Sequence, residues 1–205
     1  MLATNLRLGP ADHGRKLSLE EYHDADFVEG YRYERRQGSL VVIEVANPPH
    51  FHQVQAIYEQ LFAYKASHSG VIHSLGGGGE TRCDIEEVDS SRHADVVVYK
   101  MPNPSNNRDC WAAWIPELVI EVVSPDSRPR DYDEKPDEYL QFGVQEYWIL
   151  DAERGEMLVH RRVGGRWKKQ IVKPPELHAT HLLPGLQFSC EAVFAAAANT
   201  ASHEN

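Results

Sequence analysis

The sequence has few cysteines, a shortage of basic residues and no long apolar run. Its three cysteines, Cys83, Cys110 and Cys190, lie far apart and form no CxxC pair, so neither a zinc site nor a disulfide framework is indicated. No apolar segment approaches the length of a membrane span, and the first ten residues lack the apolar core of a signal peptide. Together these absences favour a reducing, cytoplasmic location with no membrane partner.

Positive charge is also scarce. The chain has 21 Lys and Arg against 31 Asp and Glu, which gives a formal net charge of −10. Phosphate contacts require local positive potential, so this balance argues against a protein that coats DNA tightly without sequence preference. It does not exclude nucleic-acid binding at one site, because the charge around that site decides the outcome.

Phosphate-loop motifs are absent as well. Four consecutive glycines occupy positions 76–79, but no Gly-Lys-Ser/Thr follows them and no GxGxxG is present. The glycine run is therefore interpreted as a mobile turn between strands.

The length and composition predict one domain. The 205 residues are 41% apolar and 25% charged, which is ordinary for a globular chain large enough to bury a core. We expect a flexible segment at 1–17, a single domain at 18–194 and a tail at 195–205.

Hydrophobic periodicity and turn residues predict the elements of that domain. Ser18 and Glu21 have the spacing of a capping box at the start of a short helix. A longer helix should follow Asn47-Pro48-Pro49, and a terminal helix should span 191–198. The expected strands lie at 31–36 and 40–45 (a hairpin), 71–72, 81–85, 94–99, 118–123, 147–150, 157–162 and 167–172, the last two forming an antiparallel meander.

The segment 116–151 organises the chain. Its apolar run at 118–123 reads as a strand buried on both faces and ends at Ser124-Pro125. A charged turn, a short helix and a second apolar strand at 147–150 follow. A strand, a helix and a strand in so few residues form a crossover unit, which predicts two parallel neighbouring strands and an α/β fold.

Glu121 interrupts the first of these strands. A lone buried carboxylate is costly unless a cation or hydrogen bonds compensate it. Asp95, on another predicted strand, lies 121 − 95 = 26 positions earlier, so the sheet can bring the two acids together. Two oxygen ligands on a rigid sheet suit Mg²⁺ or Mn²⁺, and Lys135 is the candidate for assisting at a phosphate. Structural pairing of Glu121 with an arginine or lysine is the alternative.

The order of the motifs carries a family resemblance. The pieces HADVVV, PELVIEVVSP, D-x-x-x-K and GVQEYWILD resemble the family of putative restriction endonucleases in the PD-(D/E)XK nuclease superfamily. YERRQGSLVV…NPPHFHQ is similar to that family's N-terminal hairpin and helix, and LLPGLQF to its closing segment. The resemblance covers about residues 18–194. It implies a restriction-endonuclease-like fold, with a mixed central sheet flanked by helices, and metal-dependent phosphodiester hydrolysis.

The resemblance assigns the site residue by residue. Asp95 matches the first aspartate of the motif, although Ala94 replaces the usual proline before it, and Glu121 matches the acidic second position. The lysine position falls on Val123, so the resemblance implies that the lysine has moved to the following helix as Lys135. Asp95, Glu121 and Lys135 are the predicted catalytic residues.

The placement of Lys135 depends on the helix that carries it. Pro136 follows at once, and proline fits only the first helical turn. If Asp133 caps the helix, Pro136 lies within that turn and Lys135 comes close to the end of the Glu121 strand. Asp131 then either orients or neutralises Lys135 at a spacing of i, i+4. Tyr139 should pack in the core, as should Trp148.

Further candidates rest on weaker signals. His52 matches the histidine at the start of the family's first long helix and is predicted as a third metal ligand or a substrate contact, or else as a solvent-exposed or helix-terminus histidine. Arg128 and Arg130 are predicted to contact phosphates, although charged turns are usually solvated. Glu34 and Glu44 are nearby acids, and the sequence does not decide whether either faces the site.

The predicted function is therefore a Mg²⁺- or Mn²⁺-dependent endonuclease acting on DNA. One alternative is a catalytically inactive module that binds a protein or nucleic acid, favoured by the negative charge and the displaced lysine. Another is an assembly protein, because Trp111 and Trp114 in the Pro/Asn-rich loop at 101–114 allow a homodimer contact.

Overall fold

A six-stranded mixed sheet forms the centre of the protein, for which a computed structural model describes residues 6–44, 47–105 and 110–198. The strand order is β12-β11-β10-β9-β8-β5. The bounds are β5 Ser74–Gly76, β8 Val96–Tyr99, β9 Leu118–Val122, β10 Glu146–Asp151, β11 Glu156–Val163 and β12 Arg166–Val172. β9 and β10 are parallel, and the other neighbours in this sheet pair antiparallel. The predicted mixed sheet and C-terminal meander are confirmed.

The central strand owes its position to its sequence. All five residues of β9 are buried, as its continuous apolar run predicts. The connection to β10 runs through a π-helical turn, η3 (Arg130–Glu134), and helix α4 (Lys135–Phe142). The predicted crossover and parallel pair are therefore confirmed.

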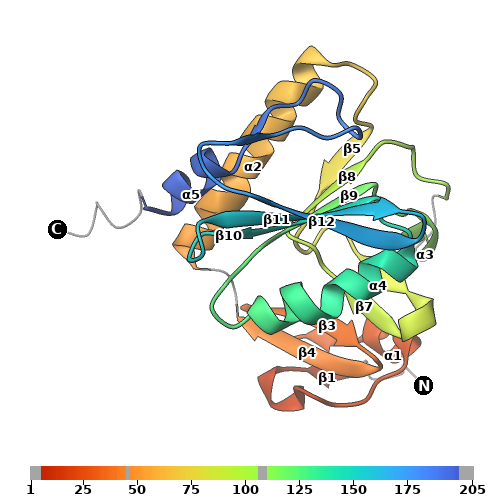
Figure 1. Ribbon diagram of the computed structural model, residues 1–205. Coiled ribbons are helices and arrows are strands. Elements are labelled where there is room, and N and C mark those ends of the chain that lie inside the picture. The colour runs from red at the N-terminus through yellow and green to blue at the C-terminus, as the bar shows by residue number, and fades with distance from the viewer. Residues whose placement is uncertain (1–5, 45–46, 106–109, 199–205) are drawn as a thin grey trace.

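Helices cover both faces of this sheet. Figure 1 shows α2 (Pro48–Ser67) and α5 (Cys190–Ala198) on one face and α4 on the other. The side chain of Asn47 caps α2 by accepting a hydrogen bond from the His50 N–H at 3.1 Å, and the two prolines occupy the first turn, where they remove no helical bond. Within the described residues, no helix is long and apolar enough to cross a membrane.

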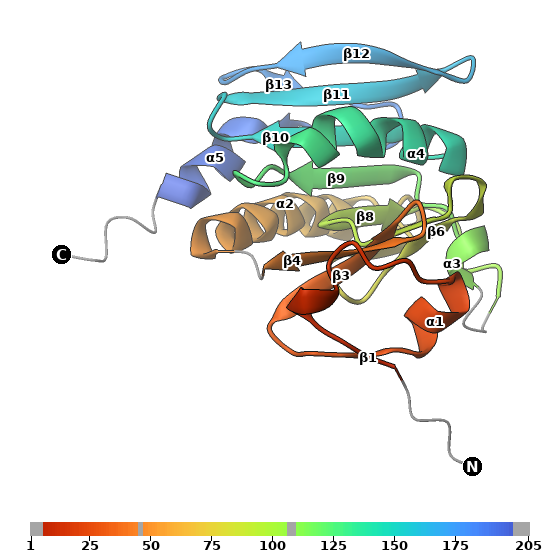
Figure 2. The ribbon, with the colours of Figure 1, turned by 90° about the horizontal axis from the view of Figure 1, so that it is seen from below.

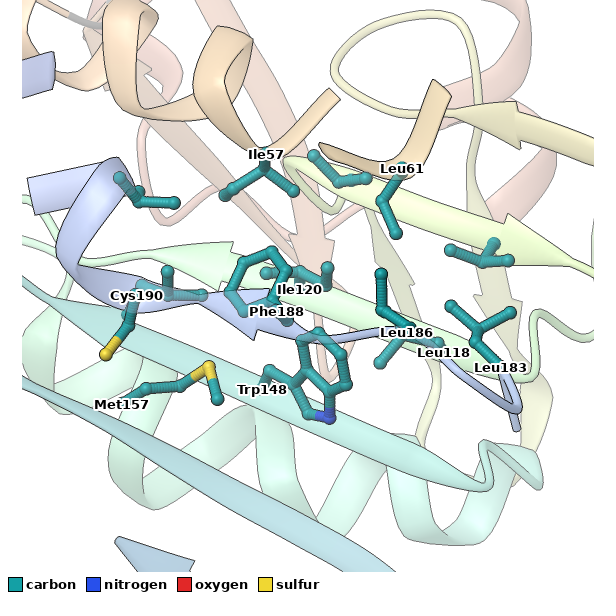
Figure 3. Close-up of a cluster of buried hydrophobic side chains, with 14 of the residues drawn as sticks. Ile57, Leu61, Leu118, Ile120, Trp148, Met157, Leu183, Leu186, Phe188 and Cys190 are labelled. Carbon is teal, nitrogen blue, oxygen red and sulfur yellow. The ribbon is translucent and has the colours of Figure 1, made fainter. Parts of the chain in front are cut away.

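The larger core lies between the sheet and the α2–α5 pair (Figure 3). Trp148 of β10 is fully buried there, against Phe188. The labelled members of this cluster come from α2, the sheet and the C-terminal segment: Ile57, Leu61, Leu118, Ile120, Trp148, Met157, Leu183, Leu186, Phe188 and Cys190. A second cluster on the opposite face includes Tyr139 of α4. The predicted core positions of Tyr139 and Trp148 are confirmed.

A four-stranded sheet of order β4-β3-β7-β6 makes a further layer. Its strands are β3 (Tyr31–Arg36), β4 (Ser39–Glu44), β6 (Cys83–Ile85) and β7 (Ser90–Arg92). The hairpin turn is Gln37-Gly38, with both residues at positive φ, as the sequence predicts. Figure 2 shows β3, β4 and the N-terminal elements on the β8 side of the central sheet, away from the β11–β12 hairpin.

The N-terminal part contributes to this layer. Strand β1 (Arg7–Leu8) pairs with β2 (Asp26–Phe27), and Leu8 and Leu17 are buried. The expectation that 1–17 frays is therefore wrong for residues 6–17. The predicted capping box of Ser18 and Glu21 begins α1 (Leu19–Asp24). The remaining short elements are η1 (Pro10–Asp12), η2 (Glu86–Val88), α3 (Cys110–Ala113), β13 (Leu177–His178) and β14 (Phe188–Ser189).

One other expectation differs locally. Residues 71–72 form no strand: Val71 lies in a turn, Ile72 packs into the core, and the edge strand β5 begins only at Ser74. The predicted terminal helix at 191–198 is confirmed as α5; it continues past residue 194, the expected end of the domain, and Val193 is buried in the core.

Candidate active site

Strand register brings the two predicted acids together. Val96 pairs with Ile120 in the antiparallel β8–β9 ladder, so Asp95, one residue earlier, lies opposite Glu121. The Val122 N–H donates to Asp95 Oδ2 at 2.9 Å. Both carboxylates thus meet on the face of the sheet that α4 covers, and both are buried.

Lys135 joins them from α4. Its Nζ lies 2.9 Å from Glu121 Oε1 and 2.8 Å from Asp131 Oδ1. The Tyr139 hydroxyl also donates to Glu121 Oε1, at 2.8 Å. Lys135 is 4% exposed, so the displaced lysine points into the protein toward the acids and away from solvent.

The helix that carries Lys135 begins earlier than the sequence predicts and contains a π-helical turn. The backbone is already helical at residue 128, so Asp133 does not cap the helix, and that expectation is wrong. A proline within a helix lacks an N–H and its ring crowds the carbonyl four residues earlier. The π-helical turn η3 widens the helix immediately before Pro136 and thereby accommodates it. This turn holds Asp131 and Lys135 in contact.

Asp95 is held by two basic side chains. Arg32 Nη1 donates to its Oδ1 at 2.9 Å, and His50 Nε2 lies 3.1 Å from its Oδ2. Burial raises the pKa of Asp95, but the hydrogen bond and charge of His50 together with the Arg32 guanidinium outweigh burial and hold that pKa well below its usual range. Asp95 is therefore ionised in the folded protein.

Glu121 has the opposite electrostatic balance. Burial raises its pKa, the Lys135 ammonium lowers it, and the negative charges of Asp95 and Asp131 raise it again, with a net rise to about 8. Its Oε2 accepts no hydrogen bond from the residues that the structure describes. Glu121 thus lies in an excess of negative charge that an added cation would relieve.

These side chains line one small cavity, here called the acidic pocket. Its volume is about 50 Å³, enough for a few water molecules. The lining includes Arg32, Glu34, His50, Asp95, Glu121 and Lys135. The three predicted catalytic residues therefore share one site.

His50, and not the predicted His52, is the histidine that lies in the acidic pocket. His50, in the first turn of α2, contacts Asp95, whereas His52 is absent from the lining and packs its ring beside Phe51 at 5.4 Å. Residues two positions apart on a helix point to different sides, which separates the two histidines. His52 is thus not placed to be a third ligand.

The two arginines of the turn behave differently. Arg128 donates to both oxygens of Asp151 at 3.1 Å and to Glu153 at 2.7 Å, so its expected phosphate contact is replaced by a structural ion pair. Arg130 lines the acidic pocket, and its buried Nε has no partner among the described residues. Only Arg130 remains placed to meet a phosphate.

The glycine run shapes the entrance to Asp95. A Cβ on Gly77 would lie 2.0 Å from the Asp95 carbonyl oxygen, and the Gly78 N–H donates to the Ala94 carbonyl at 2.7 Å. Gly77 is thus required for close backbone packing, a role that the sequence interpretation as a mobile turn missed.

The two tryptophans of the long loop are engaged within the chain. Trp114 stacks on Tyr99 at 3.9 Å and donates from Nε1 to the Met101 carbonyl at 3.0 Å. Trp111 stacks on Trp114 at 6.0 Å. Both are half-buried instead of exposed, while residues 106–109 of this loop lie outside the described residues. Their packing weakens the argument for a dimer contact.

The residues fit a hard divalent cation held by few protein ligands. Among the described residues, no group of three or more His, Cys, Asp or Glu side chains is arranged to hold a metal ion. Mg²⁺, however, keeps several waters and commonly takes one or two carboxylates. Asp95, ionised, and Glu121, with one free oxygen, match that donor set.

The sequence missed three residues of the site and its support, Arg32, His50 and Arg92, and left open whether Glu34 faces the site, whose lining it joins. Glu34 Oε2 accepts from Arg92 at 3.0 Å, and Arg92 binds Glu138 through Nε at 2.7 Å. Arg92 is fully buried. Alternating charges on one face of the strand YRYERR were the available signal, since such a face is seldom buried without partners.

Comparison with known proteins identifies the family and supports the fold. The family model Uma2, described as "Putative restriction endonuclease", matches residues 19–193. Among solved structures, one titled a putative nuclease belonging to DUF820, from Anabaena variabilis, matches with a TM-score of 0.70 and 17% identity, covering 88% of this chain and 99% of that one. No curated protein matches the chain. The structural likeness confirms the expected restriction-endonuclease-like fold.

Proposed function

The chain belongs to the Uma2 family of putative restriction endonucleases, and from this premise we propose that it is a Mg²⁺- or Mn²⁺-dependent endonuclease that hydrolyses phosphodiester bonds in DNA. One observation carries the proposal. Asp95, Glu121 and Lys135, from two strands and the helix between β9 and β10, converge in one buried pocket with a Lys135–Glu121 distance of 2.9 Å.

Each residue has a separate role in this proposal. Asp95 and Glu121 would hold the ion, which supplies polarisation of a phosphoryl oxygen and activation of water when bound. Asp131 holds Lys135 by an ion pair of 2.8 Å that does not involve Glu121, so the ammonium would stay beside the reacting phosphate. Arg130, with its unpartnered Nε, receives a non-bridging phosphate oxygen.

An inactive binding module is the second candidate, and one observation favours it. Arg32 contacts Asp95 at 2.9 Å and Lys135 contacts Glu121 at 2.9 Å, so each acid already has a basic partner from the protein. Acids that are paired in this way need not bind an ion or take part in hydrolysis.

Cleavage and metal binding together distinguish the two. Supercoiled plasmid and single-stranded DNA are incubated with Mg²⁺, Mn²⁺ or EDTA, and Mn²⁺ affinity is measured by calorimetry. We expect metal-dependent nicking that falls by more than about 100-fold in Asp95→Asn, Glu121→Gln and Lys135→Met. The two carboxylate variants should also lose Mn²⁺ binding.

The matched control is Arg36→Met, because Arg36 pairs with Glu134 at 3.0 Å but does not line the acidic pocket. It should cleave at the wild-type rate. Cleavage that survives Glu121→Gln would refute the assigned site, and absence of both Mn²⁺ binding and cleavage in the wild type would favour the binding module.

A further inference from the structure

A second pocket lies beside the acidic pocket and is lined mostly by aromatic rings. Its volume is about 270 Å³. α1 contributes Tyr22, β2 contributes Phe27, and β3 contributes Tyr31 and Tyr33. Gly79, the last residue of the glycine run at 76–79, forms part of the rim. We call this cavity the aromatic pocket.

The rings are held in place by one another and by the backbone. Phe27 lies 5.5 Å from Tyr22 and 4.4 Å from Tyr33, between ring centroids. The Tyr22 hydroxyl donates to the Tyr33 carbonyl at 2.7 Å, and the Tyr33 hydroxyl to the Val28 carbonyl at 2.8 Å. Tyr31 is the remaining ring of the lining and is 38% exposed. The pocket is therefore a rigid aromatic surface that is open at Tyr31.

Arg32 connects the two pockets, since its side chain lines both. Nη1 donates to Asp95 Oδ1 at 2.9 Å, Nη2 donates to the His93 carbonyl at 2.7 Å, and the buried Nε has no partner among the described residues. A group in the aromatic pocket would thus lie against the same guanidinium that binds a predicted metal ligand.

The lining selects a flat, aromatic ligand of small size. The volume lies just below the range of pockets for drug-sized ligands, so it suits a single ring system. Arg32 and Arg82 add cations to a lining of aromatic rings, a combination of residue types that binds nucleobases by stacking and cation–π contact. Because the chain carries a net charge of −10, stacking would supply affinity that general electrostatic attraction cannot.

We propose that the aromatic pocket binds one unpaired nucleobase of the nucleic acid whose phosphate enters the acidic pocket. This rests on the proposed nuclease function, and it gives that function a substrate preference for strands with an unstacked base, such as single strands, ends or distorted duplexes. Tyr31 supplies the accessible ring on which the base stacks. Arg32, which lines both pockets, would lie between the bound base and the phosphate.

Binding without metal tests the proposal independently of cleavage. Fluorescence anisotropy in EDTA measures the affinity of the protein for a labelled single-stranded oligonucleotide. The oligonucleotide is used intact and as a series of variants, each with an abasic site at a different position. Tyr31→Ala should weaken binding of the intact strand by about 5- to 100-fold, the range expected for one stacked base. Tyr31→Phe, which keeps the ring, should bind as the wild type does.

Two further variants complete the design. Gly79→Leu places a side chain into open space at the rim, since a Cβ there meets nothing within 4 Å, and should block the pocket without removing a ring. Phe62→Ala removes an aromatic side chain on α2 that is 54% exposed and does not line the pocket, and should change nothing. Denaturation midpoints verify that each variant is folded.

The outcomes separate the two proposals. An abasic site that weakens wild-type binding at one position, but has no further effect in Tyr31→Ala, supports the base pocket even if no cleavage is ever seen. Three results would overturn the base pocket and leave the nuclease proposal intact. The first is that the wild type fails to bind the oligonucleotide, and the second is that Tyr31→Ala and Gly79→Leu bind it as tightly as the wild type does. The third is that an abasic site weakens binding by both variants as much as it weakens binding by the wild type.

Discussion

Glu34 and Glu121 are two buried glutamates in neighbouring clusters, and their pKa values shift in opposite directions. They are 1% and 2% exposed, so burial does not distinguish them. Burial raises the pKa of Glu34, but the charges of Lys135, Arg92 and Arg32 lower it to about 2. Burial and the neighbouring acids Asp95 and Asp131 raise the pKa of Glu121 to about 8, against the opposing charge of Lys135.

The partners explain the difference. Both oxygens of Glu34 accept hydrogen bonds, Oε2 from Arg92 at 3.0 Å and Oε1 from the His93 N–H at 3.3 Å. In Glu121 both contacts go to Oε1, from Lys135 and Tyr139. The cluster around Arg92 is therefore a satisfied structural network, whereas the cluster around Glu121 is short of positive charge, as a cation-binding site should be.

The largest expected effect comes from breaking the satisfied network. Arg92→Met should destabilise the protein by about 3–5 kcal/mol, because it leaves Glu34 and Glu138 buried without their shared cation. Urea denaturation gives the change in the free energy of unfolding. Arg36→Met is the control, since this arginine is 42% exposed in its pair with Glu134, and should cost less than about 1 kcal/mol. Equal losses would show that the Arg92 network is not structural.

A smaller effect is expected from disturbing the backbone under Asp95. Gly77→Ala should cost about 1–3 kcal/mol, because its Cβ would meet the Asp95 carbonyl at 2.0 Å and force the strand entrance to move. Gly79→Ala is the matched control, since its Cβ meets nothing within 4 Å. Unfolding midpoints measure both. A stable Gly77→Ala with wild-type Mn²⁺ affinity would mean that the position of Asp95 does not depend on this packing.

The two clusters also differ in how far the sequence predicts them: the Glu121 cluster lies in a unit with clear local signals, and the Arg92 cluster does not. The unit β9–α4–β10 follows from local signals, namely an apolar run, a Ser-Pro stop and the i, i+4 spacing of Asp131 and Lys135. Those signals act within a few turns of chain, so Glu121 and Lys135 could be placed together before the structure was known.

The N-terminal contribution could not be placed in this way. Arg32 reaches Asp95 across 63 positions and Arg92 reaches Glu138 across 46, and no periodicity specifies such contacts. The choice of His50 over His52 depends on which side of α2 faces the sheet, and the apolar positions that would reveal that side begin only at Val54, after both histidines. The π-helical turn before Pro136 likewise depends on tertiary contacts of the helix.

The Glu121 cluster can be tested by its pH dependence in EDTA. With a pKa of about 8 folded and an ordinary value unfolded, the native state holds a proton that the unfolded state releases, so this residue lowers stability as pH rises from about 4.5 to 8. Glu121→Gln removes the effect. It should match wild-type stability near pH 5 and then exceed it by about 1.4 kcal/mol for each further pH unit up to about pH 8, because the wild type loses that much stability per unit between the two pKa values.

Glu34→Gln should change the pH dependence of stability in the opposite direction. Because the pKa of Glu34 is lowered to about 2, its ionised form stabilises the protein above the unfolded pKa, and that stability is lost as pH falls toward 2. The variant should therefore be destabilised at neutral pH, where Glu121→Gln is not. If urea midpoints of the two variants shift in the same direction at pH 8, the two clusters do not differ as described.

The smallest effect concerns a neutral bond that supports the Lys135 turn. Trp167 of β12 donates from Nε1 to the Pro136 carbonyl at 2.8 Å and so ties the edge strand to the first turn of α4. Trp167→Phe replaces the indole by a smaller aromatic ring and removes the donor, and the lost hydrogen bond should cost about 1 kcal/mol. Trp114→Phe removes a similar bond to Met101 at an exposed position and should cost less. A larger loss of cleavage than of stability in Trp167→Phe would show that this bond positions Lys135, whereas an unchanged rate would assign that task to the ion pairs with Asp131 and Glu121.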